Sequence, residues 1–176
     1  MSKRIKIPEE HRQVCVHHEA GHAVIARVLG FKCGGAVVPV YEMANRQGGQ
    51  ATIYASSETL KSWRRRGKFR DGRSIAHGQI MIMLAGQEAE IVCCGAYIEN
   101  GNGRDLEIAN GWLRLASPPS LERWRAKTRG LVRRHRHKIE RVAQALLAKR
   151  KLSARAIDRL MKPPEPWEGA PSLRAP

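Results

Sequence analysis

The feature that most constrains this sequence is the pentapeptide His18-Glu19-Ala20-Gly21-His22. Residues four apart lie on the same face of an α-helix, with Cβ atoms about 5–6 Å apart. Two imidazoles at this spacing can therefore bind one metal ion from a single helix. Glu19 directly follows the first histidine, so it can approach a water on the metal without being a ligand, as a general base must. The pattern predicts a zinc hydrolase site with His18 and His22 as ligands and Glu19 as the catalytic base.

The residues around this motif predict a buried helix. Glu9 and Glu10 follow Pro8 and suit a helix N-terminus, and Gly30 is a suitable stop. Apolar side chains recur at helical spacing on more than one face, which indicates burial. A glycine inside a helix costs about 1 kcal/mol, so Gly21 suggests close backbone packing. A buried histidine can also be a hydrogen-bonded core residue rather than a ligand, but the apolar helix and Gly21 favour metal binding.

The chain length and composition predict one domain. The 176 residues include a proline-rich end, so we expect a folded domain over residues 1–162 and a disordered tail over 163–176. The sequence has no run of about 18 apolar residues and no apolar leader segment. Its four cysteines form no CxxC pair, which favours reduced thiols. We therefore expect a cytoplasmic protein.

The formal net charge is +16, and the basic residues are clustered. Residues 61–73 contain seven Lys/Arg and one acid, and residues 121–155 contain thirteen Lys/Arg and two acids. Such a field attracts nucleic acid, acidic lipid headgroups or acidic protein surfaces. A highly charged, solvated helix surface is the simpler interpretation, and the sequence favours it.

The hydrophobic pattern predicts a mainly α (α+β) fold. We expect helices over residues 74–94, 104–116 and 120–149, and a short final helix capped by Ser153. Residues 36–41 and 50–54 are expected to pair as a small β-hairpin beside the HExxH helix, with Pro39 restricting the first strand to an edge. An exposed edge could bind an extended peptide, but a hairpin that only packs fits the sequence equally well.

A catalytic zinc site requires three protein ligands and one open position. Asp105 follows a glycine-rich loop and opens a predicted helix, so its carboxylate could complete the site. It could instead only complement the helix dipole, which the residues alone slightly favour. Glu90 and Glu107 are the other acidic candidates.

Four segments resemble the peptidase domain of the FtsH family of ATP-dependent zinc metalloproteases in identity, order and spacing. They are residues 14–29 (VCVHHEAGHAVIARVL), 84–95 (LAGQEAEIVCCG), 100–109 (NGNGRDLEIA) and 143–160 (AQALLAKRKLSARAIDRL). The resemblance implies a zincin-like helical domain in which Asp105 completes the zinc site with His18 and His22. It also implies a six-membered ring, although a lone domain need not assemble. The ATPase and membrane segments of the family have no counterpart in this sequence.

We therefore expect a zinc metalloendopeptidase that hydrolyses peptides or unfolded segments, ATP-independent by itself. Further possible partners are a separate ATPase, other copies of this chain in a homo-oligomer, and an acidic partner or nucleic acid on the basic surface. One alternative is a basic nucleic-acid-binding protein with a structural or vestigial metal site. The other is a peptide-binding relative that does not cleave, which the intact glutamate of the motif argues against.

Overall fold

The computed structural model describes residues 5–6, 8–38, 41–42, 50–53, 72–98, 102–116 and 120–162. Most of the basic segment at 61–73, the connection at 43–49 between the two expected strands, and the tail at 163–176 lie outside this part. The helices are α1 (Glu9–Val28), α3 (Gly72–Cys94), α4 (Gly103–Ala116), α5 (Leu121–Arg134), α6 (Arg136–Lys149) and α7 (Ala154–Met161). The strands are β1 (Ile5–Lys6), β2 (Cys33–Val37), β3 (Tyr41–Glu42), β4 (Gln50–Ile53) and β5 (Lys151–Ser153). The predicted mainly α fold with a small sheet is confirmed.

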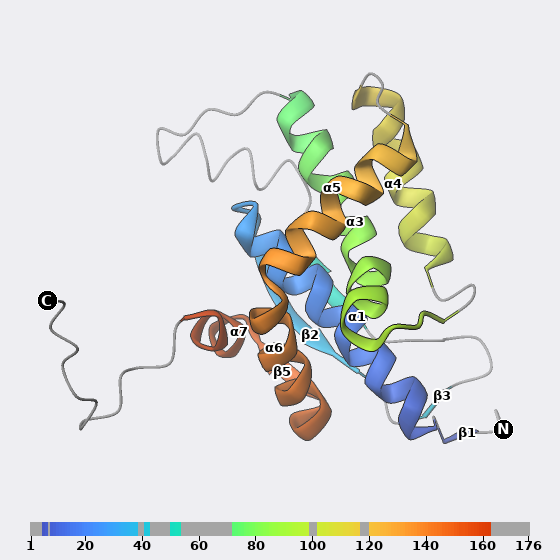
Figure 1. Cartoon of the computed structure of the whole chain (residues 1–176). Helices are drawn as coiled ribbons and strands as arrows, with labels where there is room; N and C mark the ends of the chain where they lie inside the picture. Colours follow the sequence, from blue (N-terminus) through green and yellow to red (C-terminus); the bar gives the residue numbers. More distant parts are fainter. Residues whose placement is uncertain are drawn as a thin grey trace, which may run out of the picture.

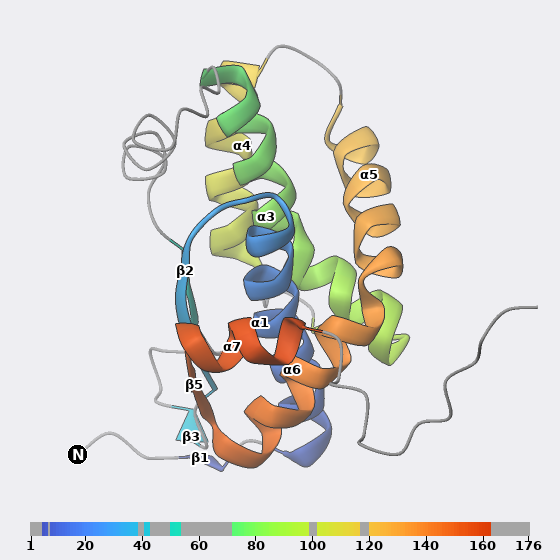
Figure 2. The same cartoon turned by 90° about the vertical axis from the view of Figure 1, so that its left-hand side faces the viewer.

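Helix α1 is the central element of the fold. It begins after Pro8 and ends at Val28, two residues before Gly30, whose φ of 79° only a glycine adopts readily. Every residue from His18 to Ala26 is buried. Helices α3 and α6 pack against α1, as do strands β2 and β4. In Figure 2 the sheet lies on one side of α1 and α5 lies on the other. The HExxH segment therefore sits in the middle of the hydrophobic core.

Helices α1 and α3 approach each other closely at Gly21. A Cβ atom at this position would lie 2.5 Å from the carbonyl oxygen of Ala85 and 2.7 Å from the Cβ of Ala89. The small residues of α3 thus allow its backbone to reach the backbone of α1, as the glycine within the motif predicted. This contact places the HExxH motif directly against α3.

The sheet contains one more strand than expected. Its order is β4-β2-β5, all antiparallel, with Ala36 opposite Ala51 on one side and opposite Leu152 on the other. The two early segments pair as predicted, but the first strand runs over Cys33–Val37 rather than residues 36–41, and Tyr41 belongs to β3. β2 is the central strand of its sheet and not an edge. The restriction expected from Pro39 does not apply, because β2 ends at Val37, before the proline. A separate pair joins β1 to β3.

The helix expected over residues 120–149 is two helices, so this prediction was wrong. The chain leaves helical geometry at His135 (φ −108°, ψ 15°), whose N–H still bonds the carbonyl of Leu131. Helix α5 packs on α3, whereas α6 packs on α1 (Figure 1). Because of the break, the apolar side chains before His135 pack on α3, and those after it pack on α1.

The last helix begins where the sequence predicted. The Oγ of Ser153 accepts a hydrogen bond from the N–H of Ala156 at 3.3 Å, which is an N-terminal cap. Ile157 of α7 is fully buried against the core. Among the helices that the structure describes, none is both long and apolar enough to cross a membrane.

The close α1–α3 contact gives a stability prediction. Gly21→Ala should destabilise the metal-free protein by about 1–3 kcal/mol, because the added methyl overlaps backbone atoms that cannot rotate away. Gly111→Ala is the matched control, since a Cβ there meets nothing within 4 Å and an exposed helix gains about 0.5–1 kcal/mol from the change. Urea unfolding of both variants measures the two effects, and equal stabilities would contradict this packing.

Candidate metal centre

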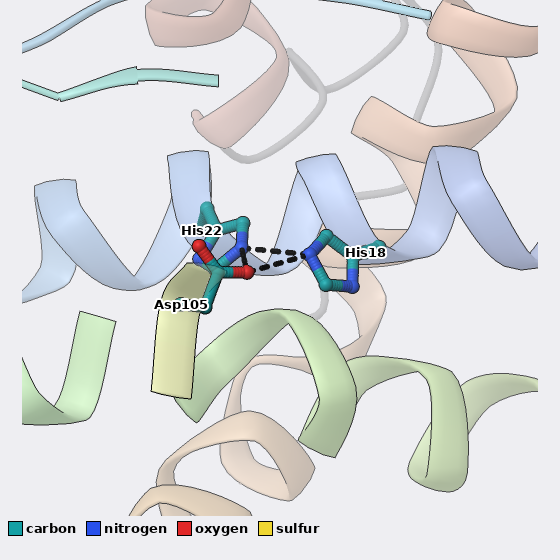
Figure 3. A group of neighbouring side chains, drawn as sticks. All are labelled: His18, His22 and Asp105. Carbon is teal, nitrogen blue, oxygen red and sulfur yellow. Dashed lines mark hydrogen bonds and ion pairs between the residues drawn. The ribbon is translucent and has the colours of Figure 1, made fainter. Parts of the chain in front are cut away.

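Helices α1 and α4 bring three side chains together at one point. The Nε2 atoms of His18 and His22 are 2.9 Å apart, and Oδ2 of Asp105 lies 3.0 Å from the first and 3.1 Å from the second. Figure 3 shows both rings projecting from α1 toward the carboxylate at the start of α4. The structure thus unites the three residues predicted as ligands, in the part of the chain that it describes.

The outer nitrogen of each ring is already engaged. Nδ1 of His22 lies 2.7 Å from the carbonyl oxygen of Ile82, which can only accept, so this nitrogen carries the proton. Nδ1 of His18 lies 2.5 Å from Oε1 of Glu90, whose other oxygen accepts the N–H of Ile98 at 3.0 Å. In their neutral forms, both rings therefore direct the lone pair of Nε2 inward.

Three lone pairs converging without a hydrogen between them repel one another and require a cation. Around a tetrahedral ion with bonds of 2.0–2.1 Å, ligand atoms lie about 3.3 Å apart. The observed separations of 2.9–3.1 Å need to widen by only a few tenths of an ångström. This His-His-Asp group can therefore hold a metal ion.

Gly86 of α3 leaves room for the converging ligand atoms. A Cβ atom at this position would lie 2.6 Å from Nε2 of His18 and 2.6 Å from Nε2 of His22. Any larger residue would contact both donor atoms. The glycine therefore keeps clear the space into which the two lone pairs point.

Glu19 is buried beside this centre, with only 5% of its surface exposed. Burial raises the pKa of its carboxyl group, and the nearby rings of His22 and His18 partly oppose that shift. The carboxylate also accepts a hydrogen bond from the backbone N–H of Ala51 in β4. Glu19 thus connects α1 to β4 of the sheet without being one of the three converging groups.

The ionisation of the ligands in the metal-free protein follows from the same contacts. Burial by itself would lower the pKa of His18, but the carboxylates of Asp105 and Glu90 outweigh it and raise the pKa to about 10. Burial would raise the pKa of Asp105, but hydrogen bonds from His18 and His22 hold it well below its ordinary value. A proton between His18 and Asp105 thus takes the place of a metal ion.

The three ligands were predicted from the sequence, but the contacts that orient their side chains were not. Glu90, considered there as a substitute ligand, instead lies on the outer nitrogen of His18, and Glu107 is exposed. The roles of Gly86 and of the Ile82 carbonyl were not predicted. The sequence did contain one indication of the first role. Gly86 and Glu90 are four residues apart in an apolar helix, so they lie on the same face, and this face meets α1. A backbone carbonyl leaves no such signal.

No known protein family matches this chain by its sequence profile, and a search of curated proteins finds none with detectable similarity. The resemblance to the FtsH peptidase domain therefore stays a prediction. The His-His-Asp geometry does not depend on it.

The contact between Glu90 and His18 predicts a loss of metal affinity in Glu90→Gln. The amide cannot accept from both Nδ1 of His18 and the N–H of Ile98, so the ring loses its fixed orientation. Such outer contacts contribute about 10–100-fold to metal affinity. Competition with a chromophoric chelator measures this, with Glu107→Gln as the exposed control. Equal affinities in both variants would show that Glu90 does not orient the ring.

The raised pKa of His18 predicts how pH affects the metal-free protein. Because the folded pKa is near 10 and the ordinary value is 6.5, this proton's contribution to stability is fully present below pH 6.5 and is lost as pH rises toward 10. Metal binding should strengthen over the same interval, since the ion displaces the proton. Denaturant unfolding across this range should show the decline in the metal-free protein and not in His18→Gln. The same slope in both would assign it to other groups.

Proposed function

We propose that this chain is a zinc-dependent metalloendopeptidase. The observation that carries the proposal is the convergence of His18, His22 and Asp105 through inward lone pairs, with Glu19 buried beside them. Two imidazoles and one carboxylate are a donor set typical of catalytic zinc sites, which keep a fourth position open. When bound, a zinc ion supplies a Lewis acid that acidifies water and polarises a carbonyl group.

Glu19 is the proposed general base. Its carboxylate would take the proton of the attacking water and then transfer it to the departing amine. Burial supports this role, because it raises the pKa of the carboxyl group and makes the carboxylate a stronger base. The hydrogen bond from Ala51 fixes the carboxylate beside the sheet, where a substrate would lie.

The free edge of β4 supports an extended peptide as the substrate. β4 pairs with β2 on one side and has no partner on its other side among the strands that the structure describes. The N–H of Ala51 reaches Glu19, so this edge passes the metal centre. A peptide added as an antiparallel strand would have its scissile bond held between the edge and the three ligands. Flexible peptides and unfolded segments can adopt this form, whereas folded proteins first require unfolding.

An ATPase partner and a homo-oligomeric ring would affect how substrates reach the site, not the hydrolysis itself. A separate ATPase could unfold substrates, and a homo-oligomeric ring could enclose them, but neither is needed to hydrolyse a peptide that is already extended. The non-cleaving alternative does not account for a buried glutamate at the position of a base, because a site that only holds peptides has no use for one.

Two substitutions test the proposal together. Glu19→Gln should retain zinc, because no ligand changes and the amide oxygen can still accept the N–H of Ala51. Hydrolysis of a quenched fluorescent peptide library should fall by about 10²–10⁴-fold, since proton transfer is lost. Asp105→Ala should weaken zinc binding at least about tenfold by removing a ligand.

The readouts are zinc content by atomic emission and peptide cleavage rate, with Glu107→Gln as the control for the loss of a carboxylate on α4. Cleavage by Glu19→Gln at the normal rate would remove the assigned base. Unchanged zinc affinity in Asp105→Ala would remove the third ligand. Stoichiometric zinc without cleavage of any peptide in the wild-type protein would favour the non-cleaving alternative.

A further inference from the structure

Helix α5 carries an unusual density of positive charge. Of its 14 residues, six are Arg or Lys and one is acidic. These cations divide between two faces with different roles. Arg125 and Arg129 point toward α3 and contact Glu88, a fully buried carboxylate, with Nε of Arg129 at 2.6 Å. This inward pair is neutralised and holds α5 on the core.

The outward cations have no acidic partner. Arg123, Lys127 and Arg134 follow one another at spacings of four and seven residues, so they share one face, and Arg133 adjoins them. All four side chains belong to exposed residues, and none forms an ion pair in the described part of the chain. At 1.5 Å per residue the row is about 16 Å long. Figure 2 shows α5 at the outer margin of the molecule, with α3 between it and α4.

Gly130 interrupts this row at its centre, and packing does not explain it. An exposed glycine inside a helix costs about 1 kcal/mol relative to alanine. Gly21 has a close neighbour that excludes a side chain, but a Cβ atom at Gly130 would meet nothing within 4 Å. With Ala126 also exposed, the helix backbone between the cations is open to a large ligand.

We propose that this face of α5 binds the phosphate backbone of nucleic acid. Arg123 and Lys127 contact phosphates on one side of Gly130, and Arg133 and Arg134 contact them on the other. Three of the four cations are arginines, whose planar guanidinium groups pair with phosphate through two hydrogen bonds. The glycine lets the polyanion approach the helix closely.

The same face fits other acidic partners less well. A helix that lies on a membrane inserts large apolar side chains between its cations, and a protein interface requires apolar anchors. The large apolar residues of α5 point inward, with Trp124 and Val132 buried. The exposed large apolar residues in the described part of the chain are Val37, Tyr97 and Ile108, none of them on α5. Lys127 lies over the ring of the buried Trp124, 4.7 Å from its centroid. The face therefore offers positive charge without an exposed large apolar side chain, which suits a phosphodiester chain.

The test is binding of a fluorescent 20-base-pair DNA duplex and a single-stranded RNA of the same length, followed by anisotropy across a potassium chloride series. For the duplex, about four phosphate contacts predict a slope of log affinity against log salt of about −3 to −4. The triple variant Arg123→Glu, Lys127→Glu, Arg134→Glu should bind at least about 100-fold more weakly and lose most of that slope. The control triple Arg155→Glu, Arg159→Glu, Lys162→Glu changes the net charge equally, on α7 and the residue that follows it, and should lose less than about fivefold.

A second pair of variants tests whether nucleic-acid binding depends on this face of α5 or only on the net charge of the protein. Gly130→Glu and Gly111→Glu introduce the same residue at exposed helix positions where space is open. We expect about tenfold weaker binding for the first and less than twofold for the second. Equal losses in each pair would show that binding follows net charge and not this face. Tighter binding of polyglutamate or anionic lipid vesicles than of either nucleic acid would overturn the choice of partner. So would the absence of measurable nucleic-acid binding by the wild-type protein at low salt.

Discussion

The convergence of three unshared electron pairs at one point is the constraint on which this fold depends. His18, His22 and Asp105 approach within 2.9–3.1 Å, although no hydrogen lies between them when both rings are neutral. A cation makes this arrangement favourable and would join α1, which carries both histidines, to Asp105 at the start of α4. Because an unfolded chain does not offer these ligands together, metal binding and folding are coupled.

The carboxylates buried around α1 and α3 show how the fold distributes charge. Glu88 is satisfied by two arginines, and Glu90 by the ring of His18 and the N–H of Ile98. Glu19 accepts an amide N–H but directly contacts no arginine or imidazole nitrogen in the described part of the chain. Burial therefore raises the pKa of Glu19, and the charges of His22 and His18 oppose that shift only in part.

The sequence predicted what depends on local spacing. The HExxH helix, the cap at Ser153 and the close contact at Gly21 follow from patterns within a few residues, and the structure confirms them. It could not predict what depends on tertiary packing. The hydrophobic pattern over residues 120–149 predicted one helix, and nothing local marks the break at His135, on either side of which α5 packs on α3 and α6 packs on α1. For Asp105, the residues alone did not separate a ligand from a helix-dipole partner, because the two roles require the same position.

Two glutamates of α3 connect the proposed peptidase centre to the proposed nucleic-acid surface. Residues two apart in a helix point to nearly opposite sides, and Glu88 contacts α5 whereas Glu90 contacts α1. Both carboxylates are buried, so breaking either contact would leave an unpaired charge in the core. The basic face and the metal centre are thus fixed to one helix from opposite sides. A nucleic acid bound along α5 would hold the β4 edge in a fixed orientation. Under the two proposals, the peptides most accessible to cleavage would be those of proteins bound to the same nucleic acid.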